Sequence, residues 1–149
     1  MEATRIMCGD LLRTTKKLIF DKGSIVKVCG VNADATLPSL NLKGYADCCL
    51  ANDDEYRAGV WLAYLEPIPL TPEFLAKYFG EVKKGRHYGL YDDYYDIDIR
   101  EWSDGIWIFV HHCTEMATPD EQVTVSYVHE LQHILRHCAL DELADKFKA

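Results

Sequence analysis

The stretch Pro67-Ile68-Pro69-Leu70-Thr71-Pro72-Glu73 decides how this chain is organised. Its first prolines keep the backbone extended, because the residue before a proline is driven out of the helical region. Thr71 is then a typical helix N-cap, Pro72 suits the first helical position, and Glu73 places negative charge at the positive end of the helix dipole. The pattern predicts the end of one lobe and the start of a helix over 72–79.

The residues before this boundary, 1–66, read as a β-rich lobe. Short segments of β-branched and aromatic residues alternate with turn signals such as Asp21-Lys22-Gly23. Short strands at this spacing are typical of a small antiparallel barrel, so we predict a β-barrel-like sheet. The expected strands are 10–12, 17–21, 24–31, 36–42, 46–50 and 58–65.

The residues after the boundary, 67–149, predict a lobe with a helix, a β-hairpin and a C-terminal helix. The expected elements are a helix at 72–79, strands at 88–99 and 105–110 joined by the turn Trp102-Ser103-Asp104-Gly105, a helix at 126–138 and one further helical turn within 141–147. We therefore predict an α+β fold in which the lobes 1–66 and 67–149 pack as one compact unit.

The composition is that of a globular protein rather than of a nucleic-acid or membrane binder. The chain has 149 residues, of which 48% are hydrophobic and 27% are charged, enough to bury a core. Its formal net charge is −8, from 24 acidic and 16 basic residues. Because phosphate groups are bound by Lys and Arg, this charge disfavours nucleic acid and anionic lipid as partners.

The sequence also carries expectations about the compartment. The apolar runs fall short of the ~20 residues that span a bilayer, and we find no signal-peptide pattern at the start. The six cysteines form no C-x-x-C pair. We therefore expect a cytoplasmic protein with reduced, mostly buried thiols, and the oligomeric state stays open.

The segment His129-Glu130-Leu131-Gln132-His133 contains the H-E-x-x-H pattern of zinc proteases. In that pattern His129 and His133 bind zinc from one helix face, and Glu130 is the general base. A catalytic zinc needs a third protein ligand, and the glycine and histidine that extend the pattern in metzincins are absent here. A zinc-dependent hydrolase is therefore our alternative, and the leading expectation has neither a catalytic residue nor a cofactor.

A helical wheel over 126–138 divides this helix into an apolar and a polar side. The polar side carries His129, His133 and His137 together with Gln132 and Arg136, and we expect it to face solvent or a partner. We predict that His129, Gln132, His133 and Arg136 form the ligand- or partner-binding surface, since they supply donors, acceptors and a cationic fork. The apolar arc contains Tyr127, Val128, Leu131, Ile134, Leu135 and Cys138.

Parts of the chain resemble a family of small uncharacterised proteins of Bacteroidetes and of their phages and prophages. The first is Glu66-Pro67-Ile68-Pro69-Leu70-Thr71-Pro72-Glu73-Phe74-Leu75, which is similar to the family's helix start. Another is Tyr127-Val128-His129-Glu130-Leu131-Gln132-His133, which resembles its C-terminal helix. The segments Gly9-Asp10-Leu11-Leu12 and Gly23-Ser24-Ile25-Val26-Lys27-Val28 are similar to its N-terminal β region.

The resemblance implies a barrel-like N-terminal part, a connecting helix, a hairpin and a closing helix, with no known catalytic residue. At the positions of Glu130 and His133 the family usually has Gln and Asn, which weakens the zinc alternative. His129 and Gln132 match the family pattern.

These observations lead to one functional hypothesis. We expect a non-enzymatic cytoplasmic binding protein of phage or mobile-element type. Its partner would be a host or phage protein, or a small ligand such as a signalling nucleotide that phage counter-defence proteins sequester. The hairpin offers a second surface of aromatic side chains, which are Tyr91, Tyr94, Trp102 and Trp107.

Overall fold

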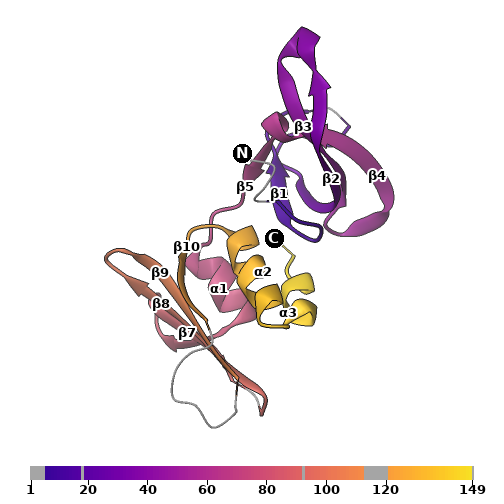
Figure 1. Ribbon diagram of the computed structural model, residues 1–149. Coiled ribbons are helices and arrows are strands. Elements are labelled where there is room, and N and C mark those ends of the chain that lie inside the picture. The colour runs from indigo at the N-terminus through magenta and orange to yellow at the C-terminus, as the bar shows by residue number, and fades with distance from the viewer. Residues whose placement is uncertain (1–5, 18, 92, 113–120, 149) are drawn as a thin grey trace. The chain divides into compact units, whose positions relative to one another are not determined.

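A computed structural model describes residues 6–17, 19–91, 93–112 and 121–148. The fold is α+β, as predicted, with antiparallel sheets and helices at the C-terminal end (Figure 1). The chain divides into two compact units, Met1–Ile68 with Asp145–Ala149, and Pro69–Ala144. The division into lobes 1–66 and 67–149 that pack as one compact unit stays a prediction.

The first unit contains a five-stranded sheet of order β4-β3-β2-β1-β5, in which all pairs are antiparallel. The described strands β4 and β5 are its edges and do not pair with each other, so the sheet is strongly curved but open (Figure 1). The predicted barrel is therefore correct only in the loose sense of a bent sheet. The strands are β1 (Leu11–Thr14), β2 (Ile25–Leu37), β3 (Leu42–Leu50), β4 (Asp53–Trp61) and β5 (Leu65–Pro67), with 3-10 turns at Pro38–Leu40 and Leu62–Tyr64.

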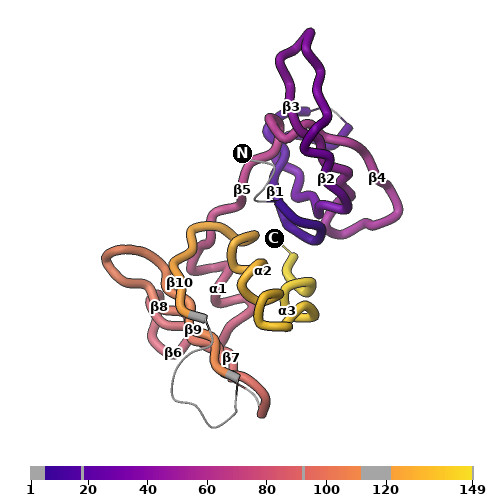
Figure 2. Tube along the Cα trace, viewed as in Figure 1, coloured from indigo at the N-terminus to yellow at the C-terminus, as the bar shows by residue number. Residues whose placement is uncertain are grey.

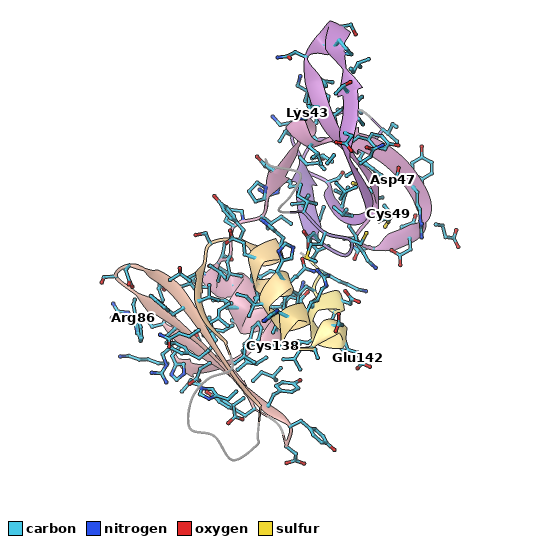
Figure 3. The ribbon with its side chains drawn as sticks, in the orientation of Figure 1. Lys43, Asp47, Cys49, Arg86, Cys138 and Glu142 are labelled. Atoms are coloured by element: carbon cyan, nitrogen blue, oxygen red, sulfur yellow. The ribbon has the colours of Figure 1, made fainter. Side chains whose placement is uncertain are left out.

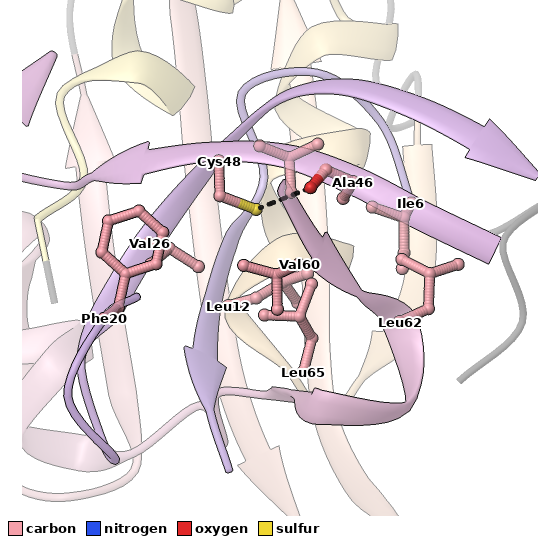
Figure 4. Close-up of a cluster of buried hydrophobic side chains, with 10 residues drawn as sticks. Ile6, Leu12, Phe20, Val26, Ala46, Cys48, Val60, Leu62 and Leu65 are labelled. Carbon is pink, nitrogen blue, oxygen red and sulfur yellow. Dashed lines mark hydrogen bonds between the residues drawn. The ribbon is translucent and has the colours of Figure 1, made fainter. Parts of the chain in front are cut away.

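One face of this sheet forms the core of the first unit. Along β3 the side chains alternate, so that Ala46 and Cys48 are buried while Asp47 is exposed. The Cys48 thiol lies in the core, its Sγ is 3.8 Å from the Ala46 carbonyl, and burial raises its pKa to about 12 (Figure 4). The buried residues of this core are Ile6, Leu12, Phe20, Val26, Val28, Ala46, Cys48, Val60, Leu62 and Leu65.

The predicted strand at 17–21 is wrong: its described residues form bends and a loop between β1 and β2. Thr14 closes this loop, because its Oγ1 donates to the Asp21 carbonyl at 2.6 Å and its own carbonyl accepts from Gly23 N–H at 2.8 Å. Of the described residues of this segment, 17 and 19–21, Phe20 alone is buried. Phe20 anchors a closed loop, and an apolar anchor in a loop gives the same local sequence pattern as a short strand.

The second unit contains a five-stranded antiparallel sheet of order β10-β9-β8-β7-β6. The predicted helix start is confirmed, since Thr71 Oγ1 accepts from Phe74 N–H at 3.2 Å. The predicted strand 88–99 is two paired strands, and β6 and β10 were not expected. The elements are α1 (Pro72–Tyr78), β6 (Gly80–Lys83), β7 (His87–Tyr91), β8 (Tyr95–Trp102), β9 (Gly105–His112), β10 (Glu121–Val125), α2 (Val128–His137) and α3 (Asp141–Asp145).

The face of this second sheet that packs on the helices is fully buried. Ile97, Ile99, Ile108 and Val110 all have 0% exposure, and these residues alternate with polar or aromatic neighbours along β8 and β9. Helix α1 contacts β6 and helix α2 contacts β10, and both lie on one side of the sheet in the tube drawing (Figure 2). The sheet thus has one face in the core and one facing away from the helices.

The orientation of α2 can be tested by unfolding. Leu131 has 0% exposure whereas His137 is exposed. We expect Leu131→Ala to lower the free energy of unfolding by about 2–5 kcal/mol, because it removes a buried aliphatic side chain. His137→Ala should change it by less than about 0.5 kcal/mol. Urea unfolding followed by circular dichroism measures both; a larger loss for His137→Ala than for Leu131→Ala would mean that the helix is turned the other way.

Candidate functional site

Helix α2 does not present the predicted surface to solvent. His129 and Gln132 are 6% and 1% exposed, and only His133 and Arg136 are half-exposed. The apolar arc is buried as expected at Leu131, but the wheel prediction of a solvated face is wrong for the two residues that matched the family pattern.

For Gln132, the cause of this burial is the tight turn that follows α2. Ala139 adopts a left-handed conformation with φ of 59°, and Leu140 N–H donates to the Leu135 carbonyl at 2.8 Å. The chain then reverses into α3, and the Gln132 Nε2 donates to the Ala144 carbonyl at 3.0 Å in a buried hydrogen bond. Gln132 therefore ties α3 to α2, which is a structural role for a residue predicted to bind a ligand.

The glutamate of the H-E-x-x-H pattern also has a structural role. The Glu130 carboxylate accepts the backbone N–H of Ser126 at 2.8 Å and of Tyr127 at 3.2 Å, so it satisfies donors at the start of α2. The rings of His129 and His133 lie 5.7 Å apart and nearly perpendicular, at 79°. Within the described part of the chain, no three His, Cys, Asp or Glu residues form a group that could hold a metal ion.

The outward face of the second sheet gathers a different set of polar and aromatic residues. The strand register places Asp98 opposite Phe109 and Arg100 opposite Trp107 on β8 and β9. On the other side of β8, His87 of β7 is opposite Arg100. Residues directly opposite each other share a face, so these side chains all lie on the side away from the buried isoleucines.

Asp98 is the centre of a hydrogen-bond network on this face. Its Oδ1 is 2.9 Å from His87 Nε2 and accepts the Tyr91 hydroxyl, and its Oδ2 accepts from Arg100 Nη2 at 3.0 Å. Burial alone would raise the pKa of the Asp98 carboxyl, but the hydrogen bonds from Tyr91, His87 and Arg100 outweigh it and hold the pKa below its usual range. Asp98 is thus kept as an anion that fixes its neighbours in place.

Gly89 makes this arrangement possible. It pairs with Asp98 across the strands, and a Cβ built on it would come within 2.3 Å of the Tyr91 hydroxyl oxygen. The absence of a side chain at 89 lets the Tyr91 ring lie back across its own strand to reach Asp98. Burial first, and then its hydrogen bond to Asp98, raise the pKa of Tyr91 to about 12, so its phenol stays protonated as a donor.

An aromatic cluster lies next to this network. The Trp102 ring centroid is 5.8 Å from that of Trp107 and 5.8 Å from that of Phe109, and Trp107 and Phe109 stack at 23°. The Arg100 guanidinium sits 5.7 Å above the Phe109 ring, which joins the cluster to Asp98. Trp107 Nε1 donates to Asp104 Oδ1 at 3.0 Å, and Trp102 remains 48% exposed.

We name this set the open face of the second sheet; its residues are His87, Tyr91, Asp98, Arg100, Trp102, Trp107 and Phe109. Trp102, Trp107 and Tyr91 belong to the second surface expected from the sequence, while Tyr94 is exposed beyond it in the turn before β8. From the sequence, the alternation of Ile97 and Ile99 with Asp98 and Arg100 already predicts that these two polar side chains share the wet face of a strand. It does not single them out as site residues, and it gives no signal for His87 or Phe109.

The Asp98 network predicts a defined pH dependence of stability. Because the folded pKa of Asp98 is lowered, the unfolded state takes up a proton more readily, and the stabilisation is present above about pH 4 and lost as the pH falls through the folded pKa. We expect Asp98→Asn to lower the free energy of unfolding by about 1–3 kcal/mol near neutrality. In urea titrations at decreasing pH, this difference should shrink; a difference that grows on acidification would contradict the network.

Among the described residues, no helix is long and apolar enough to span a membrane. Comparison of the chain with protein-family models, with curated proteins and with solved structures found no match. The similarity to the Bacteroidetes and phage family therefore stays a prediction from the quoted segments.

Proposed function

We propose that this protein is a non-enzymatic binding module of phage or mobile-element type that acts in the cytoplasm of its bacterial host. The observation that supports this most is the open face, where an exposed tryptophan stands in an aromatic cluster beside the Asp98 network. The partner we propose is a host or phage protein. The phage context comes from the sequence resemblance alone.

The residue types of the open face are those that dominate protein–protein binding energies. Trp, Tyr and Arg are enriched at hot spots, and here Trp102, Tyr91 and Arg100 occur together on adjacent strands. Their side chains are already held by ring contacts and hydrogen bonds, so little conformational entropy is lost on docking. A preorganised aromatic patch on rigid strands suits a protein partner.

The charge of the surface favours a protein over nucleic acid. Asp98 already engages Arg100, and Asp104 lies beside Trp107, so acidic groups are part of the aromatic surface. The net charge of −8 acts in the same direction. A sequestered signalling nucleotide, the small ligand considered from sequence, is retained as a second outcome of the experiment below.

The proposal is tested by comparing partner capture by matched variants. Tagged wild type, Trp102→Ala and a control, Tyr56→Ala, are incubated with bacterial host lysate, and captured proteins are quantified by mass spectrometry. Tyr56 is 56% exposed and lies on β4 of the first unit, so it matches the size and exposure of the test residue. Loss of a hot-spot residue should weaken a specific partner's affinity by at least about 30-fold, while Tyr56→Ala leaves it unchanged.

The same variants decide between the outcomes. Each captured protein is purified, and its Kd is measured by titration calorimetry alongside a panel of cyclic and linear nucleotides. A protein that binds wild type and Tyr56→Ala but not Trp102→Ala supports the proposal. If every protein binds Trp102→Ala as tightly as wild type, or if only a nucleotide binds, the protein-docking role of the open face is wrong.

The zinc alternative has its own measurement. Protein purified without a histidine tag is analysed for bound metal by atomic emission. We expect less than about 0.1 zinc per chain, because Glu130 is engaged at the helix start and a structural or catalytic zinc needs three or four protein ligands. Stoichiometric zinc that is lost in both His129→Ala and His133→Ala would overturn this and restore the hydrolase alternative.

A further inference from the structure

The thiols of Cys29 and Cys49 lie in contact on the face of the first sheet opposite its core. None of the described cysteines, Cys8, Cys29, Cys48, Cys49 and Cys138, forms a disulfide. Of these, Cys29 on β2 and Cys49 on β3 bring their sulfur atoms to 3.4 Å. Figure 3 labels Cys49 on its strand. Cys48 is the neighbour of Cys49, but it lies in the core on the opposite face.

A β-bulge places Cys29 in this position. Val28 pairs with Cys48 and Gly30 pairs with Asp47, so Cys29 is the extra residue of β2 between two ladder pairs. A bulged residue is freed from regular pairing and the strand bends there. The bulge thus turns Cys29 toward Cys49. A disulfide would require the two sulfur atoms to approach to about 2.05 Å, and the backbone at the bulge can shift to allow this.

The two sulfurs differ in exposure. Cys29 is half-buried, whereas Cys49 is 1% exposed. Burial, and then hydrogen bonds with Cys29 and Asp54, raise the pKa of the Cys49 thiol to about 12. The Cys49 thiol donates to Asp54 Oδ1 at 3.3 Å, and Lys27 Nζ lies 4.0 Å from the same oxygen. Cys29 is therefore the sulfur that an oxidant reaches first, and Asp54 is a proton acceptor beside Cys49.

We propose that Cys29 and Cys49 form a redox site that closes to an intramolecular disulfide on reaction with hydrogen peroxide. In the first step the Cys29 sulfur, as thiolate, attacks a peroxide oxygen; an S–O bond forms, the O–O bond breaks, and hydroxide leaves as water with the proton that Cys29 lost. The Cys29 sulfur is oxidised and the peroxide is reduced.

In the second step the Cys49 sulfur attacks the Cys29 sulfenic acid. The S–S bond forms, the S–O bond breaks, and the Cys49 proton passes to the Asp54 carboxylate and on to the departing hydroxyl group, which leaves as water. The sum is two thiols and one hydrogen peroxide giving one disulfide and two waters. The site does not depend on the open face and is independent of the proposed function.

The main competitor for Cys29 is Cys8. Its thiol is exposed and donates to the Cys29 carbonyl at 3.2 Å, so it also lies close to the bulge. The geometry favours Cys49 because its sulfur contacts the Cys29 sulfur itself. The two pairings give different cross-linked peptides and can therefore be distinguished.

The test uses the full chain, reduced, freed of reductant and treated with hydrogen peroxide. Thiols titrated after denaturation should fall from six to four, and peptide mapping without reductant should recover a Cys29–Cys49 cross-link that dithiothreitol reverses. Cys29→Ser should keep all five of its remaining thiols at the same dose, and so should Cys49→Ser. As a matched control, Cys138→Ser should still lose two.

A further variant isolates the role of Asp54. Asp54→Asn should slow disulfide closure by about tenfold or more and let the Cys29 sulfenic acid accumulate, trapped with dimedone, because the proton acceptor of the second step is lost. Circular dichroism of each variant checks that it is folded. A Cys8–Cys29 cross-link, six remaining thiols, or closure in Cys49→Ser would each overturn the proposal.

Discussion

The side-chain period of two along β8 and β9 is the constraint on which the second unit depends. Four apolar side chains on these strands are buried, namely Ile97, Ile99, Ile108 and Val110. Because side chains alternate along a strand, every intervening side chain lies on the other face. That is why Asp98 and Arg100 lie beside Trp107 and Phe109. Burial of the isoleucine face therefore brings the residues of the open face together. A one-residue shift in the strand register would expose the first face and bury the second.

Within the open face, electrostatics and shape work together. Asp98 is held as an anion by its three donors, and these donors are in turn fixed by Asp98. Gly89 supplies the space that the Tyr91 ring needs. A related arrangement occurs in the first unit, where the Tyr45 hydroxyl donates to Asp47 at 2.9 Å and the Tyr45 ring covers Gly59. In both sheets an aromatic ring covers a glycine and its hydroxyl donates to a carboxylate on the same face of the sheet.

Helix α2 shows how a motif can be explained by folding alone. In its H-E-x-x-H segment, Glu130 accepts backbone N–H groups at the start of the helix, and the two histidines lie one turn apart. Gln132, between the histidines, donates a hydrogen bond to α3. Each of these contacts is an ordinary way to satisfy a helix end or a buried polar group. The motif is therefore weak support for zinc chemistry, whereas the open face offers exposed aromatic and charged groups that helix packing does not use.

The sequence by itself determined the elements whose signals are local. Thr71 and Pro72 predicted the start of α1, the turn at 102–105 predicted the hairpin of β8 and β9, and the period of 3.6 predicted that Leu131 is buried. Only the tertiary structure decided that His129 and Gln132 are buried, that Cys29 meets Cys49, and that Asp98 gathers its partners. The reason is physical: periodicity reports which side of an element is apolar, whereas these contacts join segments whose approach depends on turns, bulges and strand register.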